Sequence, residues 1–220
     1  MKIKHFINIH KGATAPAVFG LMLVYDNFST AAWIYLALHG TYGALWLIKD
    51  QVYPDKSWEQ PMSLAGGVGM LVVLGLYWIA PFILISQNVS PPGAVMAAAV
   101  SLNIFGVFAH YVSDAQKHFT LKYQPGLITE GLFARCRNTN YLGEILIYFS
   151  FALLALHWLP FVILAGFAAA IFVPNMLKKD KSLARYPQFE AYRAQSGMLV
   201  PQLWGEQQVE ASGEEVTTSS

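Results

Sequence analysis

The feature that most constrains this chain is a long uncharged stretch. From Gln60 to Val112 the sequence contains no Asp, Glu, Lys or Arg. A second stretch, from Asn138 to Leu177, contains one charged residue, Glu144. A helix that spans a bilayer needs about 20 mostly apolar residues, so each stretch can hold two spans. The sequence therefore predicts an integral membrane protein.

The composition agrees with a membrane chain and argues against several other classes. Charged residues make up 12% of the 220 residues, whereas average soluble domains carry about 25%. The net charge of +1 provides no basic field for a phosphate backbone, so no nucleic-acid partner is predicted. The single cysteine cannot form an intrachain disulfide, and the histidines show no metal-ligand spacing, so no metal site is predicted.

The predicted fold class is an all-α membrane bundle of about six transmembrane helices. Their approximate ranges are 12–28, 30–48, 62–84, 93–112, 140–157 and 159–177. With this count every Lys and Arg falls on one side of the membrane, as the preference of basic loops for the cytoplasm requires. Both termini are therefore placed in the cytoplasm, and the small size favours a bacterial inner membrane. Tyr77 and Trp78 are interpreted as part of the interfacial aromatic belt.

Two segments outside the spans belong to a single membrane-embedded domain, residues 1–204, and a tail follows that domain. We expect residues 113–139 to form a long polar loop and residues 178–196 an amphipathic surface helix. The apolar face of that helix consists of Leu183, Tyr186, Phe189 and Tyr192. Residues 205–220 are acidic, small and polar, which predicts a disordered tail.

A group of polar residues lies near the mouths of the fourth and fifth spans. Lys and Arg suit phosphate groups, while Asn140 and Glu144 are one helical turn apart and share a face. An unpaired carboxylate inside an apolar run is costly, so Glu144 is the strongest functional candidate. Ordinary juxtamembrane charges are an equal alternative for the rest of the group. The group consists of Asp114, Gln116, Lys117, Lys122, Arg135, Arg137, Asn138, Asn140 and Glu144.

The same region resembles the C-terminal half of a membrane enzyme superfamily. Residues 137–144, RNTNYLGE, are similar to its motif R-x-P-N-Y-L-G-[ED], with Thr139 in the place of the proline. The superfamily includes steroid 5-alpha-reductases, sterol reductases, isoprenylcysteine carboxyl methyltransferases and phospholipid methyltransferases. The similar part, about 107–203, is reductase-like and of the DUF1295 type. Residues 113–117, SDAQK, resemble a segment near the NADPH phosphates of the reductases, and the methyltransferase Glu-Glu pair is absent from residues 175–182.

The resemblance implies an NADPH-dependent reductase of a lipophilic, steroid-like enone or alkene, with membrane lipids as its other partners. It implies a cofactor site lined by Asp114, Gln116, Lys117, Lys122, Arg137, Asn140, Tyr141, Glu144 and Tyr192. One alternative is an S-adenosylmethionine-dependent methyltransferase of an isoprenylcysteine or lipid substrate. A second alternative is a non-catalytic membrane protein.

The second span carries the candidates for chemistry on the substrate. His39, Tyr42 and Trp46 share a face because they are three and four residues apart. His39 and Tyr42 can hydrogen-bond an enone oxygen or donate a proton, so with Glu144 they are the predicted catalytic residues. A core histidine beside an interfacial aromatic pair is the alternative that sequence alone slightly favours.

Overall fold

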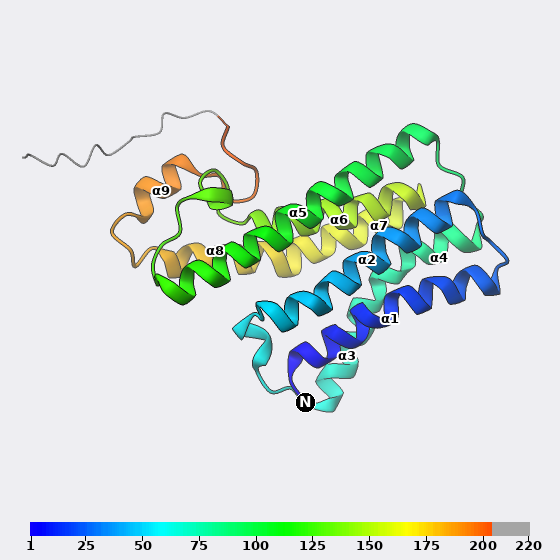
Figure 1. Cartoon of the computed structure of the whole chain (residues 1–220), viewed down its shortest axis with the longest axis horizontal. Helices are drawn as coiled ribbons and strands as arrows, with labels where there is room; N and C mark the ends of the chain where they lie inside the picture. Colours follow the sequence, from blue (N-terminus) through cyan, green and yellow to red (C-terminus); the bar gives the residue numbers. More distant parts are fainter. Residues whose placement is uncertain (204–220) are drawn as a thin grey trace, which may run out of the picture.

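The computed structural model describes residues 1–203, and these residues form helices with no strand among them (Figure 1). This confirms the all-α class. The α-helices are α1 (Ile3–Val24), α2 (Thr30–Val52), α3 (Leu64–Gly75), α4 (Ile79–Ser86), α5 (Gly93–Tyr123), α6 (Thr139–Ala155), α7 (Trp158–Phe167), α8 (Val173–Leu183) and α9 (Phe189–Gln195). The short helical elements are η1 (Lys56–Glu59), η2 (Leu76–Trp78), η3 (Gly131–Phe133) and a π-helical segment, η4 (Ala168–Phe172). The predicted tail, 205–220, lies outside the described residues.

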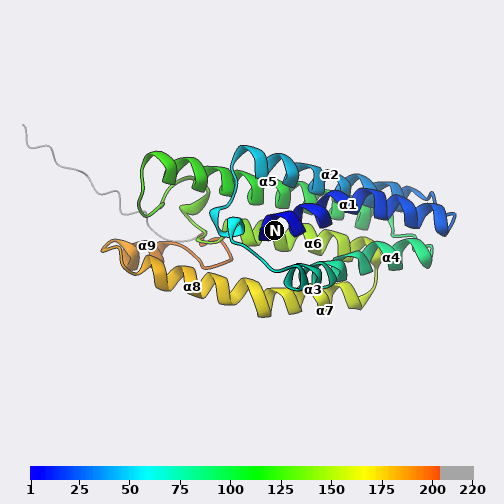
Figure 2. The same ribbon diagram turned by 90° about the horizontal axis from the view of Figure 1, so that it is seen from below.

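Consecutive helices join into long rods that run side by side. The rods Thr30–Val52, Leu64–Ser86, Gly93–Tyr123 and Trp158–Leu183 are long and apolar enough to cross a membrane. α6 is apolar but has 17 residues, and six spans, including α1 and α6, stay a prediction. Figure 2 shows α6 in the middle of the bundle, between a layer of α1, α2 and α5 and a layer of α3, α4, α7 and α8.

Side chains at the helix ends explain where two of the rods begin. The hydroxyl oxygens of Ser29 and Ser63 accept hydrogen bonds from the backbone N–H groups of Ala32 and Gly66, at 3.3 and 3.1 Å. Such caps satisfy amides that have no partner within the helix. At the start of α1, Nδ1 of His5 accepts a hydrogen bond from the backbone N–H of Lys2 at 3.3 Å, and the helix begins at Ile3 rather than at the predicted residue 12. Lys11 therefore lies within a helix rather than in front of one.

Two predicted segments outside the spans differ from the structure. Residues 113–123, expected as the start of a loop, continue α5 because no glycine or proline interrupts them before Pro125. Residues 178–196 are not one helix, because a turn that contains Pro187 separates α8 from α9. The predicted apolar face is nevertheless turned inward, since Phe189 and Tyr192 are buried and Tyr186 is half-buried.

The N-terminus and the basic connections gather at one end of the bundle. The backbone N–H of Met62 donates to the oxygen of Met1 (2.9 Å), and the ammonium of Lys117 lies 3.9 Å from the carboxylate of Asp55. The other connections meet at the opposite end, where the Asn27 amide donates to the backbone oxygen of Ile85. The basic side of the sequence is thus one end of the molecule, and its cytoplasmic location stays a prediction.

α5 and α6 pack closely together because two glycines face each other. A Cβ atom added to Gly143 would lie 2.5 Å from the backbone nitrogen of His110 and 2.6 Å from the oxygen of Gly106. Small residues allow this kind of backbone contact between membrane helices. Gly143, within the motif at 137–144, therefore fixes the position of α6 beside α5.

Candidate functional site

Several buried polar side chains of the bundle meet around Tyr42. Its ring centroid lies 6.4 Å from that of His39, 6.3 Å from that of His110 and 6.0 Å from that of Tyr148. The ammonium nitrogen of Lys11 lies 4.1 Å from the centroid of the Tyr42 ring. We call Lys11, His39, Tyr42, His110 and Tyr148 the Tyr42 cluster.

Four helices contribute to the Tyr42 cluster. α2 supplies His39 and Tyr42 from one face, as their spacing predicts, and Trp46 continues that face. α1, α5 and α6 each supply one residue to the cluster. α1 lies close to α2 because of Gly43, where an added Cβ would be 2.4 Å from the backbone oxygen of Lys11.

Both histidines of the cluster are hydrogen-bonded through one nitrogen only. Nδ1 of His39 pairs with the Tyr35 hydroxyl, and Nδ1 of His110 with the backbone oxygen of Asn140, each at 3.1 Å. Their Nε2 atoms have no partner among the described residues. The Tyr42 hydroxyl is also buried without a hydrogen bond. Because buried polar atoms are nearly always hydrogen-bonded, three unpartnered atoms around one ring mark this place as unusual.

A buried cation and a half-buried carboxylate complete this centre. Lys11 is only 4% exposed, and its ammonium donates a hydrogen bond to the Tyr148 hydroxyl at 2.9 Å. Glu144, one turn before Tyr148, makes no hydrogen bond or ion pair with a described residue. Glu144 lies on the α6 face that carries Tyr148, whose hydroxyl Lys11 contacts. The structure therefore places His39 beside Tyr42, and Glu144 one helical turn before another member of the cluster.

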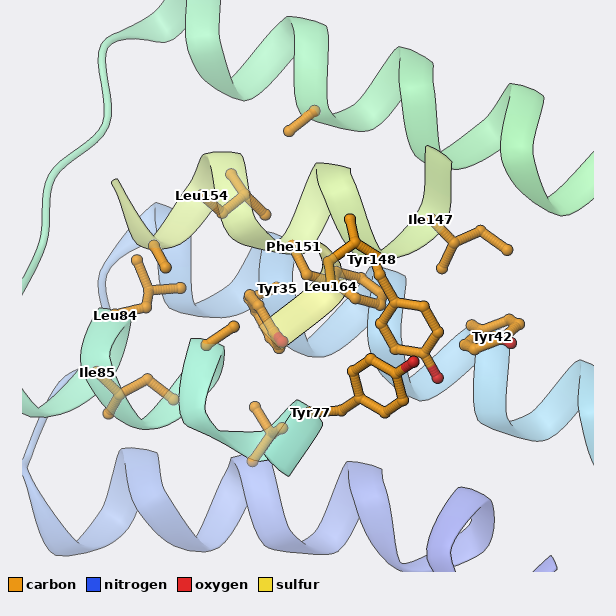
Figure 3. Close-up of a cluster of buried hydrophobic side chains, with 14 of the residues drawn as sticks. Tyr35, Tyr42, Tyr77, Leu84, Ile85, Ile147, Tyr148, Phe151, Leu154 and Leu164 are labelled. Carbon is orange, nitrogen blue, oxygen red and sulfur yellow. The ribbon is translucent and has the colours of Figure 1, made fainter. Parts of the chain in front are cut away.

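Aromatic rings close the other side of the centre. The Tyr77 ring stacks on Tyr148 with centroids 3.6 Å apart and on Phe167 with centroids 4.3 Å apart (Figure 3). The interpretation of Tyr77 as part of an interfacial belt is wrong, because Tyr77 is 7% exposed and belongs to the core. The Trp78 indole donates to the Thr14 hydroxyl at 3.0 Å, so it too contacts a neighbouring helix.

A buried ion pair lies between the Tyr42 cluster and the basic end. The Lys49 ammonium pairs with the Asp114 carboxylate and joins α2 to α5, with both side chains about one-tenth exposed or less. Lys49 is seven residues after Tyr42, which corresponds to about 10 Å along the helix. Asp114, predicted as a cofactor contact, therefore has a protein partner in this structure.

The other predicted cofactor residues on α5 differ in their surroundings. The side-chain oxygen of Gln116 accepts from the backbone N–H of Leu132, and its amide donates to the backbone oxygen of Glu130, both at 3.0 Å. Gln116 thus holds the connection between α5 and α6. Lys117 and Lys122 instead extend from the last turns of α5, and the Lys117 side chain is 43% exposed.

Arg137 and Tyr192 are engaged with neighbouring segments. The guanidinium of Arg137 bonds both carboxylate oxygens of Asp180, at 3.0 and 3.2 Å, and also the backbone oxygen of Ser196. The Tyr192 hydroxyl donates to the backbone oxygen of Phe133 at 2.7 Å. Burial raises the pKa of Tyr192 to about 12. Both predicted cofactor residues therefore hold the C-terminal segment against the start of α6.

Asn140 and Tyr141 remain near the predicted cofactor surface. Both are half-buried in the first turn of α6, on the side that leads to Glu144. The backbone oxygen of Asn140 bonds His110, and the Tyr141 ring lies 5.1 Å from the Phe172 ring. The motif thus connects the basic end of the molecule with the Tyr42 cluster.

Sequence reasoning missed Lys11, Lys49 and Tyr148 as members of this region. Lys49 continues the spacing of the α2 face, and Tyr148 follows Glu144 by one turn, so helical periodicity could have identified both. Lys11 gave no such signal, because a span that begins at residue 12 makes it an ordinary flanking charge.

Comparison with known proteins gives one match. A family described as "Protein of unknown function (DUF1295)" matches residues 55–195. No curated protein and no solved structure matches the chain. The matched residues include α3 to α9 and thus His110, Glu144 and Tyr148, but not α1 and α2, which supply Lys11 and Tyr42.

Proposed function

The chain belongs to the DUF1295 family, and we propose that it is a membrane-embedded, NADPH-dependent reductase of a lipophilic, steroid-like enone or alkene. One observation carries the proposal: the Glu144 carboxylate is half-buried in an apolar bundle and has no hydrogen-bond or ion-pair partner among the described residues. Ionisable groups at such depth are costly and are usually functional. The choice of a reductase rests on the motif resemblance and on the chemistry of these side chains.

The Tyr42 cluster has the donors that such a reaction needs. Reduction of an enone adds a hydride to one carbon and a proton to its neighbour, while negative charge develops on the carbonyl oxygen. NADPH supplies the hydride when it is bound. The Tyr42 hydroxyl and Nε2 of His39 are without protein partners and can face that oxygen. Hydrogen bonds from fixed donors in a dry interior stabilise such charge more than water does.

The basic end supplies part of the cation set that a dinucleotide phosphate needs. Lys117 and Lys122 extend from α5 and can contact phosphates. Asn140 and Tyr141 would line the passage from these lysines to Glu144. Arg137 is already bonded to a carboxylate and to backbone oxygen, so we assign to it the role of holding the mouth of the site.

One observation favours a second candidate, an S-adenosylmethionine-dependent methyltransferase of an isoprenylcysteine or lipid substrate. Because Asp180 and Ser196 occupy the donors of Arg137, fewer cations are left for a polyphosphate. S-adenosylmethionine carries no phosphate and does not require them. The same Asn140 and Glu144 surface can hold its amino-acid or ribose groups.

Direct binding distinguishes these candidates. The full chain, purified in lipid nanodiscs, is titrated by calorimetry with NADPH and separately with S-adenosylmethionine. We expect binding of NADPH alone. Binding of S-adenosylmethionine without NADPH would replace the reductase by the second candidate. Binding of neither would support a non-catalytic membrane protein.

Variants locate the binding site. Asn140→Ala and Glu144→Gln should each weaken NADPH binding about tenfold, as expected for the loss of one hydrogen bond to a polar ligand. Lys117→Gln should weaken NADPH binding more at low salt than at high salt, because salt screens the attraction between surface charges. Glu130→Gln, in the exposed connection after α5, is the matched control and should bind as the unmodified protein does.

A further inference from the structure

Lys11 has more hydrogen-bond donors than the protein satisfies. A lysine ammonium carries three donors. Among the described residues, the Tyr148 hydroxyl is the one acceptor it reaches. The rings of Tyr42, Trp46 and Tyr148 surround the remaining donors, with centroids 4.1, 5.2 and 5.4 Å from the ammonium nitrogen. A buried cation in this setting lacks the acceptors that would normally compensate its burial.

The unpartnered atoms nearby are donors or can become donors. The Tyr42 hydroxyl lies beside that of Tyr148 without the geometry of a hydrogen bond. Nε2 of His39 and Nε2 of His110 are also without a partner, and both histidine rings lie near the Tyr42 ring. A single oxygen acceptor placed here would accept hydrogen bonds from both the Lys11 ammonium and a tyrosine hydroxyl. The arrangement thus suits the carbonyl oxygen of a ligand.

An apolar groove on the side of the bundle borders this place at Tyr42, while Lys11 and Tyr148 are not among the residues that line it. It lies between α2 and α5, has a volume of about 430 Å³, and has Tyr42 among its lining residues. Known ligand sites have volumes of about 300–1,000 Å³. Exposed apolar side chains flank its opening, Ile104 being 60% and Phe108 57% exposed, as expected for a surface in contact with lipid. The groove therefore has the size and polarity of a site for one apolar chain or ring system.

We propose that Lys11, with the Tyr148 hydroxyl, binds the carbonyl oxygen of a lipophilic ligand whose apolar body occupies the α2–α5 groove. If the ligand is the substrate, this proposal rests on the proposed reductase function, in which the Lys11 ammonium stabilises the negative charge that develops on the carbonyl oxygen. Binding of the ligand itself does not require NADPH. Gly43 holds Lys11 in place, because it lets the α1 backbone contact α2 at this residue.

The test compares two probes that differ in the oxygen. Tetradecenone, a straight-chain enone, and tetradecene, an alkene of the same length, are each added to the full-length protein in detergent, and bound ligand is measured by native mass spectrometry. The unmodified protein should bind the enone about ten- to a hundredfold more tightly than the alkene, as a hydrogen bond to a charged group predicts. Equal binding of the two probes would overturn the proposal.

Three variants assign that preference to residues. Lys11→Met should remove the preference for the enone and leave binding of the alkene unchanged, whereas Lys11→Arg should retain part of the preference. Val107→Phe, in the groove lining, should weaken both probes. Lys56→Met, at an exposed residue of η1, is the control and should change neither. A Lys11→Met protein that is folded by its thermal unfolding profile and keeps the preference would overturn the proposal.

A parallel titration with NADPH separates this inference from the proposed function. Lys11→Met should keep most of its affinity for NADPH, because the two lysines proposed to contact the phosphates, Lys117 and Lys122, are unchanged. Enone binding that depends on Lys11, in a protein that does not bind NADPH, would support the inference and overturn the reductase. NADPH binding by a protein without a preference for the enone would support the reductase and overturn the inference about Lys11.

Discussion

Arg137 and Lys11 are two buried cations that the protein holds in opposite ways. The Arg137 guanidinium, on a residue 5% exposed, meets a carboxylate and a backbone oxygen. Lys11, 4% exposed, has one neutral hydroxyl and three aromatic faces. A buried cation with its own counter-ion is already satisfied, whereas one held by rings can still accept another partner. The difference separates a structural residue from a functional candidate better than burial does.

The same comparison divides the motif at residues 137–144. Its first residue, Arg137, ties α6 to Asp180 in α8. Its last residue, Glu144, has no hydrogen bond with a described residue and lies one helical turn before Tyr148 of the Tyr42 cluster. Gly143, between them, sets the distance between α5 and α6. One short motif thus contains both the support of the site and part of its chemistry.

The largest expected effect comes from Arg137→Met. This substitution leaves the half-buried Asp180 without its partner, so the free energy of unfolding should fall by about 3–5 kcal/mol. Equilibrium unfolding in mixed SDS–detergent micelles measures it, and Arg185→Met, at an exposed residue, is the control. If stability is retained while NADPH affinity is lost, Arg137 belongs to the cofactor site after all.

A smaller loss is expected for Gly43→Ala. The new methyl group would lie 2.4 Å from the Lys11 oxygen, so α1 must move away from α2. Overpacking of this kind costs about 1–3 kcal/mol, and tetradecenone binding should weaken together with stability. Gly20→Ala, in α1, is the matched control, because nothing lies within 4 Å of its added Cβ. Unchanged ligand binding in a destabilised Gly43→Ala protein would show that Lys11 keeps its place without this contact.

Lys11→Met should change stability little, in contrast to Arg137→Met. The charge that it removes has no ion-pair partner to leave behind, and replacing a buried charge by an apolar side chain is often neutral or stabilising. We expect the free energy of unfolding to stay within about 1 kcal/mol of the original value, measured in the same micelles. A loss of several kcal/mol would place Lys11 with Arg137 among the structural residues.

The distribution of charge predicted most of the fold, because long uncharged segments have few ways to satisfy their backbone groups in lipid other than as helices. The starts of α2 and α5 agree with the predicted ranges, and the faces of α2 and α8–α9 are buried as periodicity predicted. Polar composition does not predict the continuation of α5 past Val112, because polar residues are typical both of loops and of helices that extend beyond the membrane. Composition indicates where the membrane ends rather than where a helix ends.

The site was only partly predictable for a different reason. Helical spacing identified His39, Tyr42 and Glu144 on their own helices, but it does not show which cations meet a carboxylate from another helix. The resemblance implies that Asp114 and Arg137 line a cofactor site, and the structure pairs them with Lys49 and Asp180, which are distant in sequence. Pairing of buried charges is a property of the packed bundle, so it appears only with the structure.

The smallest effect concerns an exposed ion pair, a third setting for a cation beside those of Arg137 and Lys11. Hydrogen bonds from Lys2 and then from Lys4 lower the pKa of Glu59 from 4.5 to about 2. Because the pKa is lowered by folding, this contribution to stability is complete above about pH 4.5 and is lost as the pH falls through about 2. Glu59→Gln should therefore lose less thermal stability than the unmodified protein between about pH 5 and pH 2, and the difference should shrink at high salt. Melting temperatures measured across this pH range test the prediction, with Glu190→Gln as an exposed control. If the melting temperatures of Glu59→Gln and of the unmodified protein fall equally with pH, the ion pair at the start of α1 contributes nothing to stability.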